Sequence, residues 1–353
     1  MLMSELPVHT ELEPFEVVDN CLLVGGQKVT ALAARAGKTP FYAYDRKLIE
    51  RRIQKLRDGL PGDVDLHYAV KANPMPAVVD FIAPLVDGLD IASGGELQVA
   101  MDSGTDPREI SFAGPGKSLE EIRQAVAADV TVTLESATEM QRVCDAGEQL
   151  GLIPKVAVRV NPNFELKASG MKMSGGPKQF GIDAEVVPDV LREIGKHSLE
   201  FVGFHIFCGS QNLKEEAIIE AQANTVDLAL RLAQDAPREP EFLNTGGGFG
   251  IPYFPGDKPI ELHAIGQGLE KHVSAVRSAL GETKVVLELG RYIIGEAGVY
   301  VCRVRDRKVS SGQVFLVTDG GLHHNLALSG NYGQVIRKNY TVIIGNRVIS
   351  KNT

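Results

Sequence analysis

Short apolar runs alternate regularly with amphipathic segments along the middle of the chain, and this alternation constrains the fold more than any other feature. The runs are apolar on both faces and rich in β-branched residues, as is typical of buried parallel strands. We predict strands at Leu66–Val70, Gly88–Ala92, Glu109–Ala113, Val130–Leu134, Lys155–Val160, Phe201–Ile206, Glu241–Asn244 and Val285–Leu289. Apolar residues at i, i+3 and i+4 predict helices at Arg46–Leu60, Pro76–Leu85, Gly95–Asp102, Ser118–Ala127, Ala137–Leu150, Val186–His197, Leu213–Gln234 and Glu261–Leu280. This pattern predicts an α/β protein with a (β/α)8 TIM barrel, and a doubly wound open sheet is the alternative.

Both ends of the chain predict β structure instead of strand–helix pairs. Strand-like runs stand at Phe15–Val18, Cys21–Val24, Phe41–Tyr44, Val299–Val304, Val314–Thr318 and Val342–Val348. We therefore expect two domains, a barrel at residues 42–290 and a discontinuous β-rich domain built from residues 1–41 and 291–353.

Charge and cysteine content exclude several classes of protein. The formal net charge is -8, with no dense run of Lys and Arg, which argues against nucleic acid and anionic membranes as partners. No stretch approaches the ~18 consecutive apolar residues of a membrane span, and the acidic N-terminus lacks the apolar region of a signal peptide. The four scattered cysteines form no C-x-x-C pair, which predicts no metal site and fits a reducing cytoplasm. A cytoplasmic enzyme and a soluble binding protein both remain compatible with these features.

The ends of strands seven and eight carry an anion-binding pattern. In α/β barrels the working residues follow the strands, and phosphate commonly binds after strands seven and eight. Gly246–Gly248 follow strand seven, and Gly290 and Arg291 follow strand eight. Successive glycines let backbone N–H groups approach an anion, and the arginine fork suits phosphate oxygens. The alternative is a tight glycine turn beside an exposed arginine.

Lys71 directly follows the first apolar strand, and Glu288 stands in the last one. Schiff-base chemistry needs a neutral amine, which a desolvated lysine with a lowered pKa would provide. A lysine that extends to the barrel mouth is an equally weighted alternative. Glu288 is a candidate acceptor for a protonated ring nitrogen. Phosphate, Schiff base and ring-nitrogen partner together indicate pyridoxal phosphate (PLP).

Several ordered motifs link these positions to a known family. They are YAVKAN (Tyr68–Asn73), DIASGGEL (Asp90–Leu97), RVNPN (Arg159–Asn163), GSQ around Ser210, NTGGGFG (Asn244–Gly250), ELGRYIIGEAGVYV (Glu288–Val301) and DGG (Asp319–Gly321). From about residue 14 onward the chain resembles the PLP-dependent amino-acid decarboxylases of the alanine-racemase fold type, the diaminopimelate and ornithine decarboxylase group. GGPKQFGI and SGNYGQVIRKNY resemble the diaminopimelate-decarboxylase-like enzymes of exosortase or secondary-metabolite clusters.

The resemblance implies α-decarboxylation of an amino acid through an external aldimine and a quinonoid, releasing CO2. Lys71 would hold PLP as an internal aldimine, and Glu288 would pair with the pyridine nitrogen. Asp90 and Arg159 would line the cofactor side of the mouth. The phosphate would be bound by Ser210, Gly247, Gly248, Gly290 and Arg291. The family also implies a homodimer with shared active sites and a small amino-acid substrate, free or carrier-bound.

Three departures from the family pattern stand out. Phe207 occupies the position of a histidine that usually stacks on PLP, and we expect its ring to stack there instead. His205, two residues earlier, is expected to point elsewhere as a hydrogen-bonded core residue. ELGR replaces EPGR and keeps Glu288 and Arg291 in place. The cysteine and acidic residue that the family's C-terminal domain supplies should follow GNRV, so we expect the β domain to lack its C-terminal part when the chain ends at Thr353.

Substrate recognition and the class of reaction leave alternatives open. Residues Asn163–Lys178 read as a mobile lid, whose Lys167, Lys172 and Lys178 would attract an acidic substrate or simply be solvated. His323 and His324 follow DGG and are candidate substrate contacts or surface residues. A racemase is disfavoured because Ala-Asn-Pro-Met follows Lys71, where racemases usually have Ala-Tyr-Gly-His. A non-catalytic, regulatory PLP-binding homologue is the other alternative.

Overall fold

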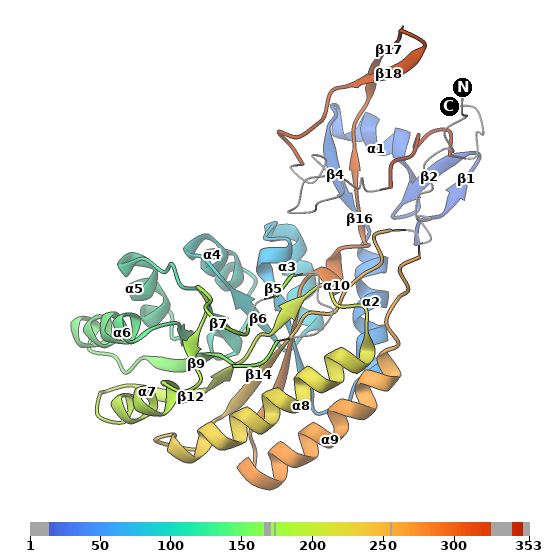
Figure 1. The fold of residues 1–353 in the computed structure, drawn as a ribbon. Coiled ribbons are helices and arrows are strands. Elements are labelled where there is room, and N and C mark those ends of the chain that lie inside the picture. The colour runs from blue at the N-terminus through green and yellow to red at the C-terminus, as the bar shows by residue number, and fades with distance from the viewer. Residues whose placement is uncertain (1–13, 166–170, 173, 255, 326–340, 349–353) are drawn as a thin grey trace. The chain divides into compact units, whose positions relative to one another are not determined.

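The central strands form a closed parallel barrel in the computed structural model, which describes residues 14–165, 171–172, 174–254, 256–325 and 341–348 (Figure 1). The strands are β5 (Val64–Ala69), β6 (Gly88–Ile91), β7 (Ile110–Phe112), β8 (Thr131–Leu134), β9 (Lys155–Asn161), β12 (Glu200–His205), β14 (Phe242–Gly247) and β15 (Lys284–Leu289). Pairing of β15 with β5, and of β8 with β9, closes the ring. The predicted (β/α)8 barrel is therefore confirmed, and the open-sheet alternative is wrong because no barrel strand is left at an edge.

Helices surround the barrel and follow the predicted positions closely (Figure 1). They are α2 (Arg46–Gly59), α3 (Pro76–Ile82), α4 (Gly94–Asp102), α5 (Leu119–Ala127), α6 (Ala137–Leu150), α7 (Val187–Ile194), α8 (Glu215–Leu232), α9 (Leu262–Leu280) and the short α10 (Arg291–Ile294). Ser118 and Glu121 form a reciprocal capping box at the start of α5. This cap fixes the start of α5 where its sequence spacing predicts it.

Polar side chains fill part of the barrel interior. Leu66 and Tyr68 on β5 are buried, whereas His67 between them projects to the opposite face and contacts Asp90 on β6. The amide of Asn244 on β14 also reaches Asp90, at 3.4 Å. Two strands, β15 and β5, separate β14 from β6 in the sheet, so this contact crosses the lumen. The interior therefore carries a polar layer just below the C-terminal ends of the strands.

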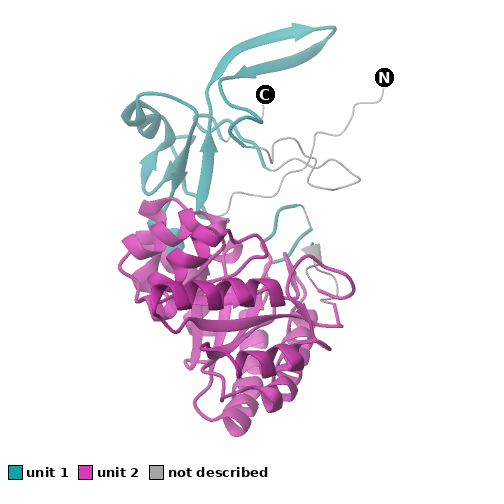
Figure 2. Ribbon diagram, turned by 90° about the vertical axis from the view of Figure 1, so that its left-hand side faces the viewer, with its two compact units in different colours: residues 1–49, 252–258, 296–353 teal, residues 50–251, 259–295 magenta. Residues whose placement is uncertain are grey.

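The chain divides into two compact units (Figure 2). Unit 1 comprises residues 1–49, 252–258 and 296–353, and unit 2 comprises residues 50–251 and 259–295. The small elements of unit 1 are β1 (Val17–Val18), β2 (Cys21–Val24), β3 (Gln27–Lys28), α1 (Val29–Ala36), β4 (Phe41–Tyr44), β16 (Gly298–Val301), β17 (Val304–Ser310) and β18 (Gln313–Thr318). Antiparallel pairings join β1 to β2, β2 to β3, β4 to β16 and β17 to β18. A small apolar core containing Phe15, Leu22 and Val24 holds the first of these sheets.

At the chain ends one element was not predicted and one predicted strand is wrong. Residues Val29–Ala36 form a helix rather than β structure, since this alanine-rich stretch ends on Gly37 with φ at 74°. Residues Val342–Val348 form no strand, although Ile343 and Val348 pack on the unit 1 core. Their apolar side chains pack on that core. In the sequence, such apolar residues look the same as those of a strand.

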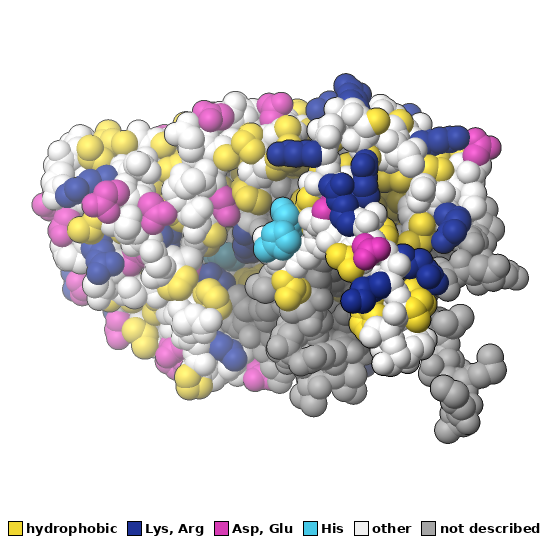
Figure 3. Space-filling view, turned by 90° about the horizontal axis from the view of Figure 1, so that it is seen from above, with side chains coloured by type: hydrophobic (Ala, Val, Ile, Leu, Met, Phe, Trp, Pro, Cys, Tyr) yellow, Lys and Arg dark blue, Asp and Glu magenta, His cyan; other side chains and the backbone are white. Residues whose placement is uncertain are grey.

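The surface of unit 1 includes a basic stretch in and just before β17. Arg303, Arg305, Arg307 and Lys308 are all exposed, and dark blue side chains gather on the surface nearest the viewer in Figure 3. Arg305 pairs with Asp319 at 2.9 Å, so part of this charge is neutralised. None of the helices within the described ranges is both long and apolar enough to cross a membrane.

Candidate active site

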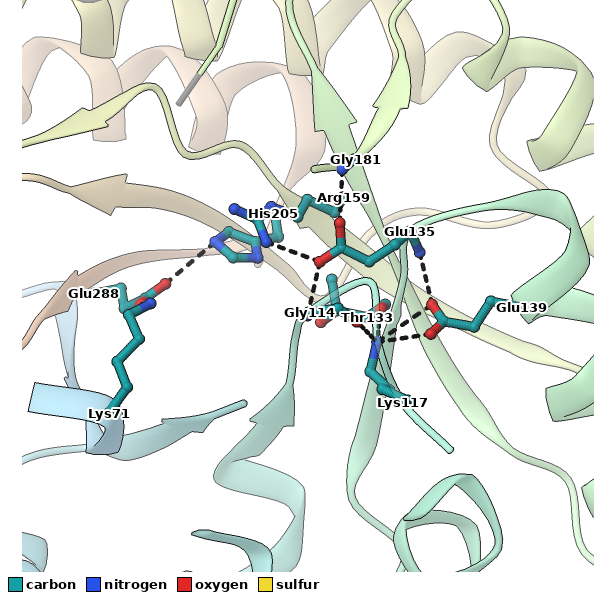
Figure 4. Close-up of polar contacts among 10 residues, drawn as sticks. All are labelled: Lys71, Gly114, Lys117, Thr133, Glu135, Glu139, Arg159, Gly181, His205 and Glu288. Carbon is teal, nitrogen blue, oxygen red and sulfur yellow. Dashed lines mark hydrogen bonds and ion pairs between the residues drawn. The ribbon is translucent and has the colours of Figure 1, made fainter. Parts of the chain in front are cut away.

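Lys71 and Glu288 form an ion pair at the mouth of the barrel (Figure 4). Lys71 lies in a single 3-10 turn, η1 (Val70–Ala72), that follows β5, and Glu288 lies near the end of the neighbouring strand β15. The Lys71 Nζ to Glu288 Oε1 distance is 2.9 Å. Two residues that are distant in sequence are thus joined in the way that the strand-end argument predicts.

Lys71 is more exposed to solvent than its position after an apolar strand suggested. Its side chain is 57% exposed, because the turn η1 carries it out of the strand and into the mouth. The Glu288 carboxylate raises the pKa of Lys71, whereas burial of the ammonium opposes that shift. The expectation of a lowered pKa for Lys71 is therefore wrong. A neutral amine requires that the proton held between Lys71 and Glu288 be removed first.

His205 lies inside the barrel against Glu288, so the expectation that it points elsewhere is wrong. Its Nε2 is 3.2 Å from Glu288 Oε2, and its side chain is almost fully buried on β12. Burial favours the neutral form of Glu288, but Lys71 and His205 outweigh it and hold the pKa of this carboxyl well below its usual value. The carboxylate is therefore ionised although it is only 5% exposed.

Asp90 has three polar neighbours within the barrel. One of its oxygens accepts a hydrogen bond from the Ser111 hydroxyl, and the other lies 3.3 Å from Nδ1 of His67. The amide of Asn244 is the third neighbour. Burial lowers the pKa of His67, but the attraction of Asp90 outweighs burial, so the pKa is raised overall. Asp90 is thus tied to His67 below the site, and nothing in its sequence motif indicated this histidine.

Arg159 on β9 is fixed on two sides. Its Nη1 donates a hydrogen bond to Glu135 Oε1 at 2.8 Å, and its guanidinium lies 4.8 Å from the centre of the Phe180 ring. Glu135 also accepts from the backbone amides of Gly114 at 2.7 Å and Gly181 at 2.6 Å. One buried carboxylate thus joins the arginine to the loops that follow β7 and β9.

A second buried ion pair, between Lys117 and Glu139, lies next to Glu135 and holds its backbone (Figure 4). The Lys117 ammonium lies 3.1 Å from Glu139 Oε1, and Glu139 Oε2 accepts the backbone amide of Glu135 at 2.8 Å. Lys117 also donates to the carbonyls of Gly114 and Thr133. Glu135 directly follows the predicted strand Val130–Leu134, and Lys117 lies just after the predicted strand Glu109–Ala113, but their roles and that of Glu139 were not predicted. Their charges at those strand ends were the available indication.

The glycine turn after β14 packs too closely for any side chain. Gly246 and Gly248 have φ of 67° and 73°, and a Cβ on Gly248 would lie 2.1 Å from the carbonyl oxygen of Gly209. A Cβ on Gly247 would lie 2.2 Å from the carbonyl oxygen of Glu288. The turn therefore lies against the Gly209–Ser210 strand β13 and against the end of β15. The predicted phosphate-binding residues Ser210, Gly247, Gly248, Gly290 and Arg291 all belong to these three adjoining segments.

Phe207 lies close to Lys71 at the barrel mouth. The ring centre is 5.6 Å from Lys71 Nζ, which is within cation–π range. Phe207 also borders a cavity of about 20 Å³ together with Gly247 and Gln222, a residue of α8. This proximity to Lys71 is compatible with the expected ring stacking.

The segment expected to form a lid is partly anchored to the site. Its strand β10 (Met171–Lys172) pairs antiparallel with β13, so that Met171 lies opposite Ser210. The buried hydroxyl of Ser174 donates to the carbonyls of Phe164 and Cys208. The anchored part of the segment is therefore built into the turn that carries Ser210. Lys167 and the motif at 329–340 lie outside the described residues.

His323 and His324 belong to unit 1 and are exposed. Their rings lie 4.1 Å apart, and the carbonyl of His324 accepts a hydrogen bond from the Tyr42 hydroxyl. The substrate-contact hypothesis for the two histidines stays a prediction.

The residues present fit pyridoxal phosphate. The donor set combines an amine (Lys71), a buried ionised carboxylate (Glu288) and a glycine turn that a Cβ would block. An aldehyde, a protonated ring nitrogen and a phosphate are the three groups that such a set can recognise. The chemistry of the site therefore matches the cofactor that the sequence motifs imply.

Comparison with known proteins supports the same assignment. Residues 46–295 match the family model described as "Pyridoxal-dependent decarboxylase, pyridoxal binding domain". The L-glutamyl-[BtrI acyl-carrier protein] decarboxylase of Niallia circulans is 34% identical over 89% of this chain and 73% of its own length. The diaminopimelate decarboxylase of Aquifex aeolicus is also 34% identical, over 89% and 74% of the two chains.

Solved structures show the same architecture. The diaminopimelate decarboxylase of M. jannaschii superposes with a TM-score of 0.82 at 25% identity, over 91% of this chain and 76% of that one. Because both the family match and the relatives extend across the whole barrel with its lysine, this chain belongs to the pyridoxal-dependent decarboxylases and is a PLP-dependent amino-acid carboxy-lyase.

Proposed function

We propose that Lys71 is the residue that binds PLP covalently and that Glu288 faces the pyridine nitrogen. The ion pair of 2.9 Å between them carries this proposal, because it brings a reactive amine and an ionised carboxylate to one barrel mouth. Ser210, Gly247, Gly248, Gly290 and Arg291 then bind the phosphate, since their segments adjoin at the same end of the barrel. Asp90, Arg159 and Phe207 line the remaining sides.

Bound PLP supplies an electron sink that stabilises the charge left behind when a substrate carboxylate departs as CO2. The protein places the reacting groups and controls their protonation. Glu288 accepts a hydrogen bond from the Lys71 ammonium, and the exposed lysine becomes nucleophilic once it has passed a proton to solvent water. Arg159, held by Glu135, keeps a fixed positive charge at the mouth that favours a substrate carboxylate.

The substrate is proposed to be an amino acid that loses its α-carboxylate. The similarity to diaminopimelate decarboxylases supports a free diamino acid. The similarity to a decarboxylase of a glutamyl group on an acyl-carrier protein supports a carrier-bound substrate as the second candidate. Both share the same chemistry at the α-carbon and differ in what extends from the distal end.

The proposal also includes a homodimer with shared active sites. It keeps the predicted division into a barrel at 42–290 and a β domain from 1–41 and 291–353. The relatives match 89% of this chain, which supports a common assembly. The four cysteines are all free thiols, which supports a cytoplasmic location.

Borohydride trapping tests the assignment of Lys71. The protein is incubated with PLP, reduced, digested and analysed by mass spectrometry, and the added mass should lie on the peptide that contains Lys71. Lys71→Ala should lose both the label and the visible absorbance, while Lys55→Ala, on an exposed face of α2, should keep both. A label on any other lysine would contradict the proposal.

Carbon dioxide release then distinguishes the substrates. The wild-type protein is assayed with a panel of free amino acids and with a glutamyl thioester on a carrier protein. Release from free diaminopimelate alone supports the first candidate, and release from the thioester alone supports the second. No release from any member of the panel, with Lys71 labelled, would favour the non-catalytic homologue.

A further inference from the structure

His205 contacts one half of the Glu288 carboxylate while Lys71 contacts the other. The two contacts use different oxygens, Oε2 at 3.2 Å from His205 Nε2 and Oε1 at 2.9 Å from Lys71 Nζ. Glu288 is thus held from two sides, by η1 at the end of β5 and by β12 on the far side of β14. The carboxylate stays ionised in a buried position because both partners act on it.

This balance changes when Lys71 is used. An amine that condenses with an aldehyde forms a C=N bond and releases one water, so it no longer acts as a free ammonium toward Glu288. A carboxylate that is 5% exposed then needs its remaining partner more strongly, since an unpaired buried charge is costly. His205 is the partner that does not take part in that bond.

The other polar side chains next to His205 have partners of their own. Arg159 lies opposite His205 in the pairing of β9 with β12, and its guanidinium is bound to Glu135. Asn244 lies opposite His205 on β14, and its side chain binds Gly246 N and Asp90. Among the described residues, the polar group that lies against the His205 ring is therefore the Glu288 carboxylate.

We propose that His205 is a positioning residue whose Nε2, 3.2 Å from Glu288 Oε2, keeps this carboxylate ionised and aimed at the ring nitrogen of the cofactor. The proposal rests on the role proposed for Glu288. It adds that a second residue, outside the sequence motifs that carry the family resemblance, sets how strongly the site prefers a ligand with a basic ring nitrogen.

The contacting atom makes the test specific. A glutamine amide nitrogen can occupy the position of His Nε2, whereas asparagine is too short and reaches only the position of Nδ1. His205→Gln should therefore keep the contact and His205→Asn should lose it. His67 is a matched control, because it is also buried and contacts a carboxylate, Asp90, but through Nδ1 at 3.3 Å. His67→Asn makes the same substitution elsewhere in the barrel interior and leaves Glu288 alone.

The experiment compares two ligands of the apoprotein, PLP and its 1-deaza analogue, in which C–H replaces the ring nitrogen. Dissociation constants are measured by absorbance titration, and the ratio of the two constants reports the ring-nitrogen preference. We expect His205→Asn to lower the preference for PLP by about tenfold, as loss of a hydrogen bond to a charged group does. His205→Gln should stay within about threefold of wild type, and His67→Asn should leave the ratio unchanged.

An equal loss of affinity for both ligands in His205→Asn would overturn the proposal, because a merely structural histidine would weaken both alike. A wild-type ratio near one, with PLP still trapped on Lys71, would instead contradict the role of Glu288. Should His205→Asn fail to fold, His205→Ser, which also lacks an atom at the Nε2 position, takes its place against His205→Gln.

Discussion

Glu135 accepts a hydrogen bond from Arg159 Nη1 at 2.8 Å, and both side chains are buried where neighbouring strands β8 and β9 end. The same carboxylate accepts the amides of Gly114 and Gly181. A charged arginine in this position is stable only while Glu135 is present, because the desolvation of a guanidinium needs a compensating charge.

Glu135→Gln should therefore lower the free energy of unfolding by roughly 3 kcal/mol, since it leaves the buried Arg159 charge without a counter-ion. It should also weaken PLP binding, because the arginine at the mouth is no longer fixed. Urea denaturation and absorbance titration measure the two effects. Glu193→Gln is the control: its carboxylate pairs with Lys196 on an exposed face, and its loss should leave stability nearly unchanged. Equal effects of the two substitutions would contradict this prediction.

Lys117→Met should destabilise the protein more than Lys117→Met combined with Glu139→Gln. The single substitution strands the buried Glu139 carboxylate and removes the donor to the carbonyls of Gly114 and Thr133, at a cost of roughly 3–5 kcal/mol. The double substitution removes the stranded charge and should recover part of that loss. Denaturant midpoints with unchanged slopes check the order. A double variant that is less stable than the single one would show that the pair does not act as a unit.

The His67–Asp90 pair should make stability pH-dependent. The pKa of His67 is raised in the folded protein, so its contribution to stability is fully present below the usual value of 6.5 and is lost as the pH rises through the folded pKa. The stability difference between wild type and His67→Asn should therefore shrink as the pH increases above 6.5. Denaturation curves at several pH values between 5.5 and 9 measure it, with ~1.4 kcal/mol per unit of pKa shift as the scale. A difference that stays constant across this range would refute the ion pair.

Gly248→Ala should abolish PLP retention and destabilise the barrel, because the added Cβ meets the Gly209 carbonyl at 2.1 Å in addition to the strain of a positive φ. Gly151→Ala separates the two causes. Gly151 has a similar φ of 68° at the end of α6 but open space around its Cβ position, so it should cost only about 1 kcal/mol. Gel filtration followed by absorbance measures retained PLP. Retention by Gly248→Ala at the level of Gly151→Ala would exclude the close approach as the reason for this glycine.

The barrel could be predicted from the sequence because its strands are short, apolar on both faces and separated by helices of regular spacing. Lys71 and Glu288 could be placed together for the same reason, since strand ends converge at one end of a barrel. The helix Val29–Ala36 and the irregular residues Val342–Val348 were missed because both serve a small local core.

The polar contacts behind the site were beyond prediction. The pairs Lys117–Glu139 and His67–Asp90 join residues that lie 22 and 23 positions apart on neighbouring strand–helix units, and spacing along the chain does not say which charges meet. His205 was misplaced for a similar reason. An apolar strand that contains one histidine does not reveal whether that residue faces the helices or the lumen, and the inward face here is the polar one.

The pairing of Met171–Lys172 with Gly209–Ser210 links substrate selectivity to cofactor binding, two properties that protein engineers usually vary separately. The segment that follows β9 is a natural place to randomise in a search for new substrates. Because its backbone hydrogen-bonds to the turn that carries Ser210, and Ser174 ties it to Cys208, many such replacements would release the cofactor before they altered selectivity. Libraries that keep residues 171, 172 and 174 and vary the neighbouring positions should therefore retain far more PLP-loaded members.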